Sequence, residues 1–209
     1  GIAAAEGKVA ALVGDASNEE AFILQDLIRN GLGSPDIDSR QAPTIGRGQR
    51  IRLDDPSTQA RVSDIDHADV VLVLGTDPIH SAPAFDLRVR KAVRRNGTAL
   101  AVATERPSAL DGGAAEVERI APGQSASYLA GLLDQVKSGA SDGIAGLLKD
   151  STHTVVIWGE RIGRGETGPA AIESLLELTS TLGIAGQEES GLIEIPDVAN
   201  ARGLREVGC

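Results

Sequence analysis

The sequence predicts an α/β fold: a mainly parallel, doubly wound, Rossmann-like sheet with helices on both faces. Short apolar runs that end near glycine alternate with stretches of helical periodicity, which is typical of a parallel sheet. Hydrophobic residues make up 41% of the chain but aromatic residues only 2%, and a core of Val, Ile, Leu and Ala favours a compact α/β protein over a β-sandwich. Residues 1–209 are expected to form a single α/β domain, and a division into two small α/β lobes near residues 139–152 stays open.

The individual elements follow from the same alternation. Apolar runs of strand length predict strands at 8–13, 70–74, 99–103, 117–120, 155–158 and 192–195. Apolar residues at helical spacing predict helices from Glu19 to Ile28 and at 83–96, 125–136, 144–149 and 170–182. The stretch 34–60 contains a basic run and has no clear period, so we expect a long loop there. Residues 63–68 are expected to form a turn of helix.

The acidic balance of the chain excludes some function classes. The formal net charge is −10, which argues against a nucleic-acid-binding surface and against docking by charge onto anionic lipid. No apolar run reaches the roughly 18 residues of a membrane-spanning helix, so no direct membrane insertion is expected. The single cysteine, Cys209, excludes an internal disulfide and a cysteine-ligated cluster within this sequence. Cys209 is expected to be a mobile thiol.

The sequence has 0 Met residues, and Gly1–Glu6 lacks the basic start and the apolar centre of a signal peptide. We therefore expect a piece of a longer or processed polypeptide, with part of its chemistry outside this sequence.

The segment from Ala68 to Pro83 is the strongest candidate for a binding site. A buried strand is predicted to end at Gly75, and a polar loop separates it from the helix that begins at Pro83. Ligands of open α/β sheets bind at this carboxyl edge of the strands. Asp77 is therefore a candidate acceptor for a ribose or a base edge. Ser81 is a candidate phosphate ligand, although capping of the following helix explains it equally well.

Two further loops are candidates for anion binding. Ser17 lies in the turn before the first helix, where free backbone N–H groups favour a phosphate, but a capped helix start is the simpler interpretation. Arg106 follows the strand at 99–103 and can pair with a phosphate or with a neighbouring acid such as Glu105. The Gly-rich loop 159–165 is expected either to cover a cleft or to be a plain connector.

The sequence assigns no metal ligand and no catalytic residue. The three histidines lie on different predicted elements without ligand spacing. We find no nucleophile–base set, no nucleophile elbow and no Walker A lysine.

The order of several segments resembles that of the molybdopterin oxidoreductase family. This family includes formate dehydrogenases, nitrate reductases and the large iron–sulfur subunit of bacterial NADH–quinone oxidoreductase (complex I). The matching segments cover nearly the whole sequence: Gly14–Phe22, Leu32–Asp38, Asp64–Pro83, Arg88–Ala92, Ile120–Gln124 and Ala199–Gly208. The last of these segments is most similar to the complex I subunit.

The chain departs from the cofactor-binding relatives at the loops that would face the cofactor. Those relatives usually carry Asn-Pro after the second strand, where this chain has Asp77-Pro, and Asp-Pro-Arg after the third, where it has Thr104–Pro107. A carboxylate in place of an amide is unfavourable beside a guanine nucleotide in a dry pocket. The resemblance therefore implies a vestigial cofactor site, at Asp77, Ser81, Arg106 and Ser17, in a structural scaffold without molybdopterin.

The resemblance also implies a setting for the chain. Iron–sulfur clusters in a preceding N-terminal part would carry electrons from NADH towards quinone. The partners would be other subunits of the peripheral arm of NADH–quinone oxidoreductase, and the location would be cytoplasmic, on the inner face of the bacterial plasma membrane through the complex.

Two alternative functions stay open. The first is a guanine-dinucleotide molybdopterin-binding domain of a molybdenum or tungsten oxidoreductase such as formate dehydrogenase. The second is the nucleotide-binding middle domain of a thiamine-dependent enzyme, which would have a single six-stranded parallel sheet and no further lobe.

Overall fold

The computed structural model describes residues 8–39 and 45–209, which belong to two compact units. Unit 1 consists of Gly1–Pro43 with Pro196–Cys209, and unit 2 of Thr44–Ile195. The elements of unit 1 are β1 (Ala11–Leu12), α1 (Asn18–Asp26), the π-turn η2 (Leu27–Gly31), β2 (Ile37–Asp38) and α8 (Ala201–Glu206). The strands of unit 2 are β3 (Val70–Leu74), β4 (Ala99–Thr104), β5 (Glu116–Arg119), β6 (Thr154–Gly159) and β7 (Gly191–Ile195). Its helices are α2 (Arg47–Leu53), α3 (Pro78–Ser81), α4 (Pro83–Asn96), α5 (Ser125–Ser138), α6 (Gly143–Lys149) and α7 (Gly168–Thr181), and its 3₁₀ turns are η3 (Val62–Asp66), η4 (Asp111–Gly113) and η5 (Glu160–Gly163).

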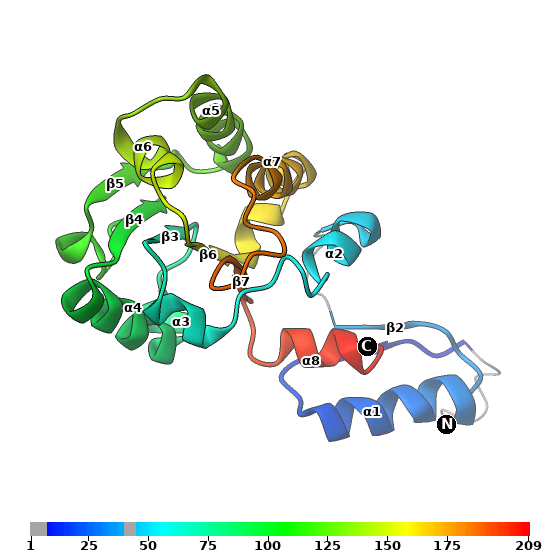
Figure 1. The fold of residues 1–209 in the computed structure, drawn as a ribbon. Coiled ribbons are helices and arrows are strands. Elements are labelled where there is room, and N and C mark those ends of the chain that lie inside the picture. Colours follow the sequence, from blue (N-terminus) through cyan, green and yellow to red (C-terminus); the bar gives the residue numbers. More distant parts are fainter. Residues whose placement is uncertain (1–7, 40–44) are drawn as a thin grey trace. The chain divides into compact units, whose positions relative to one another are not determined.

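The five strands of unit 2 form one parallel sheet in the order β5-β4-β3-β6-β7 (Figure 1). β3 is central, with Val70 opposite Ala99 on one side and Thr154 on the other. All residues of β3 are buried, because both faces of a parallel sheet are covered, and this explains its unbroken apolar sequence. The chain adds β4 and β5 on one side of β3 and then crosses to the other side for β6. The carboxyl ends of β3 and β6 therefore form a topological switch point.

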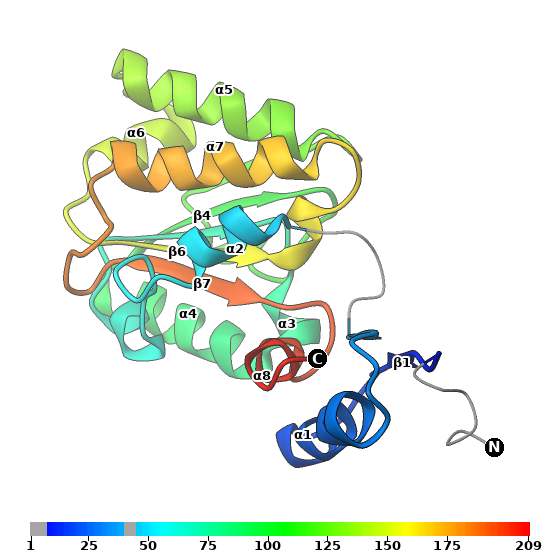
Figure 2. The ribbon, with the colours of Figure 1, turned by 90° about the vertical axis from the view of Figure 1, so that its right-hand side faces the viewer.

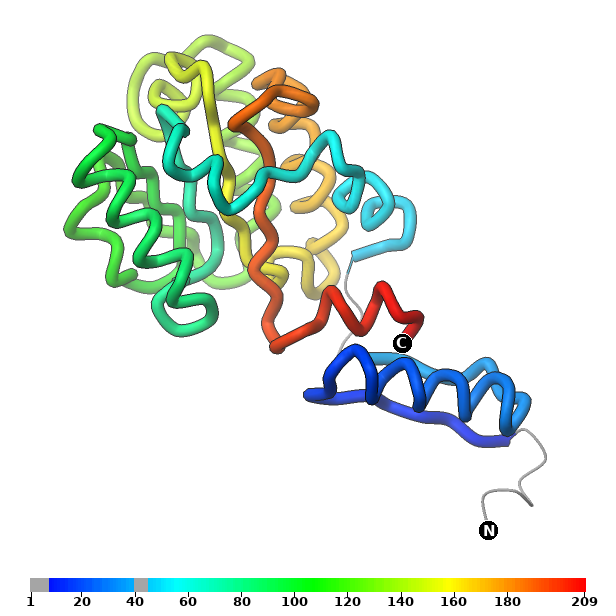
Figure 3. The backbone as a smooth tube through the Cα atoms, turned by 60° about the horizontal axis from the view of Figure 1, so that its bottom comes forward, coloured from blue at the N-terminus to red at the C-terminus, as the bar shows by residue number. Residues whose placement is uncertain are grey.

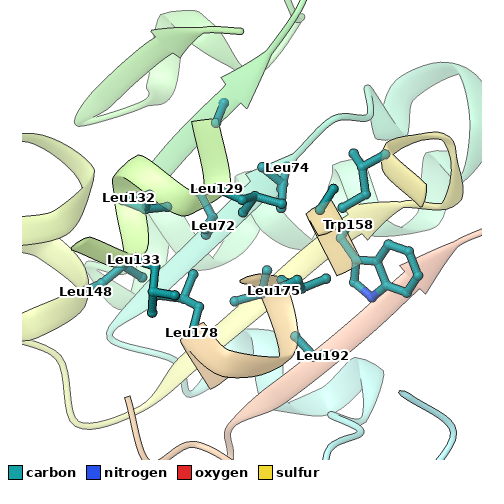
Figure 4. Packing of buried hydrophobic residues seen from close by; sticks show 14 of the residues in the cluster. Leu72, Leu74, Leu129, Leu132, Leu133, Leu148, Trp158, Leu175, Leu178 and Leu192 are labelled. Carbon is teal, nitrogen blue, oxygen red and sulfur yellow. The ribbon is translucent and has the colours of Figure 1, made fainter. Parts of the chain in front are cut away.

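Helices cover both faces of this sheet (Figure 2). On one face α5, α6 and α7 pack on β3 and β6, and Leu72, Leu74 and Trp158 contact the leucines of these helices, including Leu129 and Leu175 (Figure 4). The opposite face packs against α4, and its buried residues include Val71, Val73, Val89, Ala92, Leu100 and Val102. Alternate residues of each strand thus supply two separate apolar cores.

The predicted fold class is confirmed, and so are the predicted strands and helices of unit 2, with ends that differ by one or a few residues. Within the described residues the sheet of unit 2 has five strands rather than six, and a separate unit is present. Both observations count against the middle domain of a thiamine-dependent enzyme.

The prediction of a long loop over 34–60 is corrected in part, because this stretch contains α2 and the short strand β2. Arg52 of α2 donates two hydrogen bonds to Glu173 of α7, with Nη1–O distances of 2.7 and 2.9 Å. Gln49 donates to the carbonyl oxygen of Pro169 at 2.6 Å. The helix is held by these tertiary contacts rather than by a strong apolar period, so the sequence pattern did not reveal it. The part of the predicted loop at 40–44 lies outside the described residues.

Unit 1 is a β–α–β arrangement in which β1 and β2 pair in parallel and α1 runs alongside them (Figure 3). Its small core contains Val13, Ala21 and Leu204, the last from α8. The strand predicted at 8–13 is confirmed over Ala11–Leu12.

Cys209 packs within unit 1, and the prediction of a mobile thiol was wrong. The Cys209 side chain lies against the core of unit 1, and its Sγ donates to the carbonyl oxygen of Ala21 at 3.4 Å. The carbonyl oxygen of Cys209 accepts from Ser39 Oγ at 3.1 Å. Burial raises the pKa of the Cys209 thiol, so the thiolate is disfavoured there.

Residues 139–152 lie inside unit 2 and are not a boundary between the two compact units. The reason is α6, whose Ile144, Ala145 and Leu148 are fully buried in the same core as β3 and α7. Among the helices of the described residues, none combines the length and the apolar character needed to cross a bilayer.

Candidate functional site

The strand ends at the switch point are packed against each other. Gly75 follows β3 in a left-handed conformation (φ 64°), and a Cβ at this position would come 2.3 Å from Cγ2 of Ile162 in η5. A Cβ on Gly159, at the end of β6, would come 2.8 Å from the carbonyl oxygen of Gly75. Ile162 is only 5% exposed. The side chain of Ile162 therefore fills the space between these two strand ends.

Asp77 lies in the loop after β3, and backbone groups occupy both oxygens of its carboxylate. Oδ1 accepts the N–H of Ile79 at 3.3 Å and caps α3, while Oδ2 accepts the N–H of Ala109 at 3.2 Å. Ala109 belongs to the connection from β4 to β5. A carboxylate suits this position because it offers two acceptor oxygens and no donor. Asp77 thus joins the loop after β3 to the β4–β5 connection.

Arg90 of α4 holds the same residue, Ala109, through the following peptide group. It donates to the carbonyl oxygen of Ala109 at 2.8 Å and to the buried carboxylate of Asp86 at 2.8 Å. The hydrogen bond to Asp86 raises the pKa of Arg90 above its ordinary value. Asp77 and Arg90 together fix the β4–β5 connection against α4.

Ser81 does not cap the following helix, because the N-cap position of α4 is Ala82. Its hydroxyl donates instead to the carbonyl oxygen of Asp77 at 3.2 Å, within α3. The structure thus brings Ser81 and Asp77 together, and their contact stabilises a turn.

Arg106 is exposed after β4, at the same edge of the sheet as Asp77 and Ser81. Among the described residues its guanidinium makes no ion pair and no hydrogen bond. Pairing with Glu105, one of the two alternatives for Arg106, is not formed, and Glu105 instead accepts the N–H of Gly123 at 3.3 Å. Of the three predicted residues at this edge, Arg106 alone keeps its donors available to solvent.

Ser17 belongs to unit 1 and not to the unit that contains the other three candidates. Its Oγ accepts the N–H of Glu20 at 3.3 Å, and its own N–H donates to Glu20 Oε2 at 2.9 Å. This reciprocal pair is a capping box at the start of α1. The helix-capping interpretation of Ser17 is therefore confirmed, and its hydroxyl is already engaged.

A mostly buried ion pair at the carboxyl end of β7 escaped the sequence analysis. Arg50 of α2 forms a bidentate contact with Glu194, with N–O distances of 2.6 and 3.0 Å. The side chains are only 15% and 10% exposed. Burial disfavours the charge on Arg50, but the hydrogen bonds and charge of Glu194 outweigh it and raise the pKa of Arg50. The sequence does carry one signal of this pair, because Glu194 interrupts the apolar run of β7.

Two histidines approach one carboxylate at the opposite, amino edge of the sheet. His67 Nδ1 lies 3.8 Å from Oε1 of Glu189, and His153 Nε2 lies 3.9 Å from Oε2. Across the described part of the chain, no group of three or more His, Cys, Asp or Glu side chains is arranged to hold a metal ion.

Comparisons with known proteins identify the family. The chain is 29% identical over 216 residues to the G subunit of the NADH-quinone oxidoreductase of Mycobacterium bovis and to that of Mycobacterium tuberculosis, covering 100% of this chain and 24% of each relative. It is 24% identical over 234 residues to the NADPH-Fe(3+) oxidoreductase subunit alpha of Geobacter sulfurreducens, covering 92% of this chain and 28% of that relative. The chain therefore spans about a quarter of the length of these relatives. The family model for molybdopterin oxidoreductase matches residues 1–208, and the chain accordingly belongs to the molybdopterin oxidoreductase family.

Proposed function

We propose that this chain is a structural scaffold, without molybdopterin of its own, within a subunit of an NADH–quinone oxidoreductase. The observation that carries the proposal is the closure of the switch point, where Ile162 packs on Gly75 and the carboxylate of Asp77 is used by two backbone N–H groups. Groups that would otherwise face a ligand are engaged in holding the loops together.

The residues at this edge do not fit a guanine-dinucleotide molybdopterin. Asp77 would place a negative charge beside a phosphate-bearing ligand bound at this edge, and its two acceptor oxygens are already engaged. The buried side chain of Ile162 fills the gap between the ends of β3 and β6. We therefore assign no redox step to this edge.

The proposal places the electron-carrying iron–sulfur clusters in other parts of the longer polypeptide. Its support is that the relatives named above are subunits of oxidoreductases and are about four times as long as this chain. The partners are then other subunits of the peripheral arm, and the location is the cytoplasmic face of the bacterial plasma membrane.

The first test concerns the cofactor. The purified chain is analysed for molybdenum by mass spectrometry and for pterin by fluorescence after oxidation, and is then titrated with GMP to about 1 mM by calorimetry. We expect no stoichiometric metal or pterin and no saturable heat. Stoichiometric cofactor, or GMP binding that Arg106→Ala abolishes, would instead favour the guanine-dinucleotide-binding domain.

The second test concerns the scaffold role and uses the full-length subunit in its complex. Arg106→Glu reverses the charge of the one predicted residue at the carboxyl edge whose donors stay free among the described residues. NADH–quinone activity in membranes should remain unchanged. A loss of activity with the complex fully assembled contradicts the proposal.

A further inference from the structure

A cleft of about 190 Å³ lies between α4 and the connection from β4 to β5, and Arg90 and Ala109 of the site described above form part of its lining. Parallel strands are usually joined by a crossover helix. Here the connection contains only the short turn η4, and Gly112 and Gly113 of that turn carry no side chains to fill the space beside α4. The cleft thus lies beside a connection that contains no crossover helix.

Basic side chains concentrate on the helix that forms one wall of this cleft. α4 carries five of the chain's 20 basic residues, and its single acid, Asp86, is buried. These residues are Arg88, Arg90, Lys91, Arg94 and Arg95. In a chain with a formal net charge of −10, such a concentration on one helix marks a surface that attracts negative charge.

The basic residues of α4 differ in how far they are neutralised. Arg90 pairs with Asp86, while Arg88 and Lys91 lie 3.5 and 3.3 Å from the same oxygen of Asp66. Within the described residues, Arg94 and Arg95 have no acidic partner and no hydrogen-bond acceptor. Arg94 lines the cleft and Arg95 does not. The cleft thus has one unpaired cation on its wall, and the neighbouring Arg95 is a natural control.

The floor of the cleft is apolar. Leu100 and Leu110 line it and are 2% and 1% exposed, and Val93 of α4 lies beside them. Its volume is below the roughly 300 Å³ at which pockets for small-molecule ligands begin, so a nucleotide does not fit. A side-chain carboxylate with a neighbouring aliphatic group matches both the charge and the size.

We propose that this cleft binds an acidic segment of a partner protein, with a carboxylate on Arg94 and an adjacent apolar side chain beside Val93. The proposal goes beyond the scaffold role and does not depend on it, since the cleft would bind the same segment whether or not the switch point holds a cofactor.

The test uses the purified chain and a fluorescein-labelled hexapeptide of sequence Glu-Leu-Glu-Glu-Leu-Glu, followed by fluorescence anisotropy. Arg94→Glu should weaken binding at least about tenfold, because it replaces an attraction by a repulsion. Arg95→Glu makes the same change of charge outside the cleft and should weaken binding less than about threefold.

A second variant separates shape from charge. Gly112→Leu adds an apolar side chain beside the cleft without altering the charge, at a position where a Cβ meets no atom within 4 Å. It should abolish binding while the circular dichroism spectrum is retained. Equal losses for Arg94→Glu and Arg95→Glu, or full binding by Gly112→Leu, overturn the proposal in favour of diffuse surface attraction. Displacement of the peptide by inorganic phosphate at equal concentration overturns it in favour of a simple anion site.

Discussion

The two edges of the sheet in unit 2 differ in how the chain uses them. At the carboxyl edge, Ile162 fills the space beside Gly75, and Asp77 is bonded to two loops. At the amino edge, a cavity of about 490 Å³ remains beside the start of β3, and its lining is acidic. The acids that line it are Asp69, Glu116, Asp142 and Asp150. The same strands run between both edges, so closure is a property of the carboxyl-edge loops and not of the sheet.

The comparison predicts that the carboxyl edge tolerates change least, and Gly75→Ala should have the largest effect. The added methyl group meets Ile162 at 2.3 Å in a left-handed conformation, so unit 2 should lose roughly 3 kcal/mol of stability. Trp158 is the single tryptophan and is buried at this edge, so urea unfolding followed by its fluorescence measures the effect.

A matched control for Gly75→Ala is Gly97→Ala at the end of α4. Gly97 is also left-handed (φ 78°), but a Cβ there meets no atom within 4 Å. Gly97→Ala should lower the free energy of unfolding by about 1 kcal/mol, from backbone strain alone. Equal losses for the two variants would mean that the carboxyl edge is not tightly closed.

The second largest effect is expected from Arg50→Met, which leaves Glu194 without its bidentate partner in a mostly buried place. The loss should be roughly 2 kcal/mol by urea unfolding. Arg52→Met breaks the pair with Glu173, whose side chains are 50% and 51% exposed, and should cost less than about 1 kcal/mol. The double variant Arg50→Met, Glu194→Leu should recover most of the stability that Arg50→Met loses. If it does not, the two side chains stabilise the fold by packing or hydrogen bonds in addition to their charges.

A smaller effect is expected from Asp77→Asn, which keeps one acceptor oxygen but turns the other into a donor. The N–H of Ala109 then faces an amide nitrogen, and unit 2 should lose about 1 kcal/mol by the same urea measurement. A variant more stable than the parent would show that the carboxylate is retained for a ligand and not for the loop.

The smallest effect is expected at the open amino edge. The N–H groups of His153 and Thr152 donate to Asp69 Oδ2, and these hydrogen bonds, the one from His153 above all, hold the pKa of Asp69 below its ordinary value against the opposing effect of burial. Asp69→Asn should therefore cost only about 0.5 kcal/mol at neutral pH, since the group is exposed.

The stability difference between the parent and Asp69→Asn should depend on pH, because the pKa of Asp69 is lowered in the folded state. A lowered pKa in the folded state stabilises the fold above the ordinary carboxyl pKa of about 3.9, and the benefit disappears as the pH falls through the lowered value. Urea unfolding of parent and Asp69→Asn from neutral to acidic pH should converge below that value. A difference in the free energy of unfolding that stays constant with pH would show that Asp69 stabilises the fold through hydrogen-bond geometry and not through its charge.

Much of the fold could be predicted from the sequence, because its signals are local. The apolar run of β3, the glycine after it and the proline at the start of α4 each act within a few residues. The order of strands could not be predicted, since nothing in the sequence says that β6 pairs with β3. The same limit applies to α2, whose residues are held by Glu173 and Glu194 far along the chain.

The candidate site was predicted in its place but not in its contacts. Gly75 and Asp77 do lie at the carboxyl edge of the sheet, as the strand–loop–helix pattern indicated, but the strand order that makes this end of β3 a switch point was not predicted. That Asp77 binds the peptide of Ala109 depends on the path of the β4–β5 connection. That Ile162 fills the gap depends on the pairing of β6 with β3. Both are consequences of tertiary packing, which residue types alone do not specify.

The division of the chain into units also has a consequence for biosynthesis. Unit 2 is one continuous stretch, whereas unit 1 needs Leu204 of α8 to complete its core. During translation unit 2 can fold as soon as β7 has left the ribosome, while the earlier residues of unit 1 must wait for the last turn of helix. The residues of unit 1 that precede Thr44 are thus translated before unit 2 but complete their fold after it.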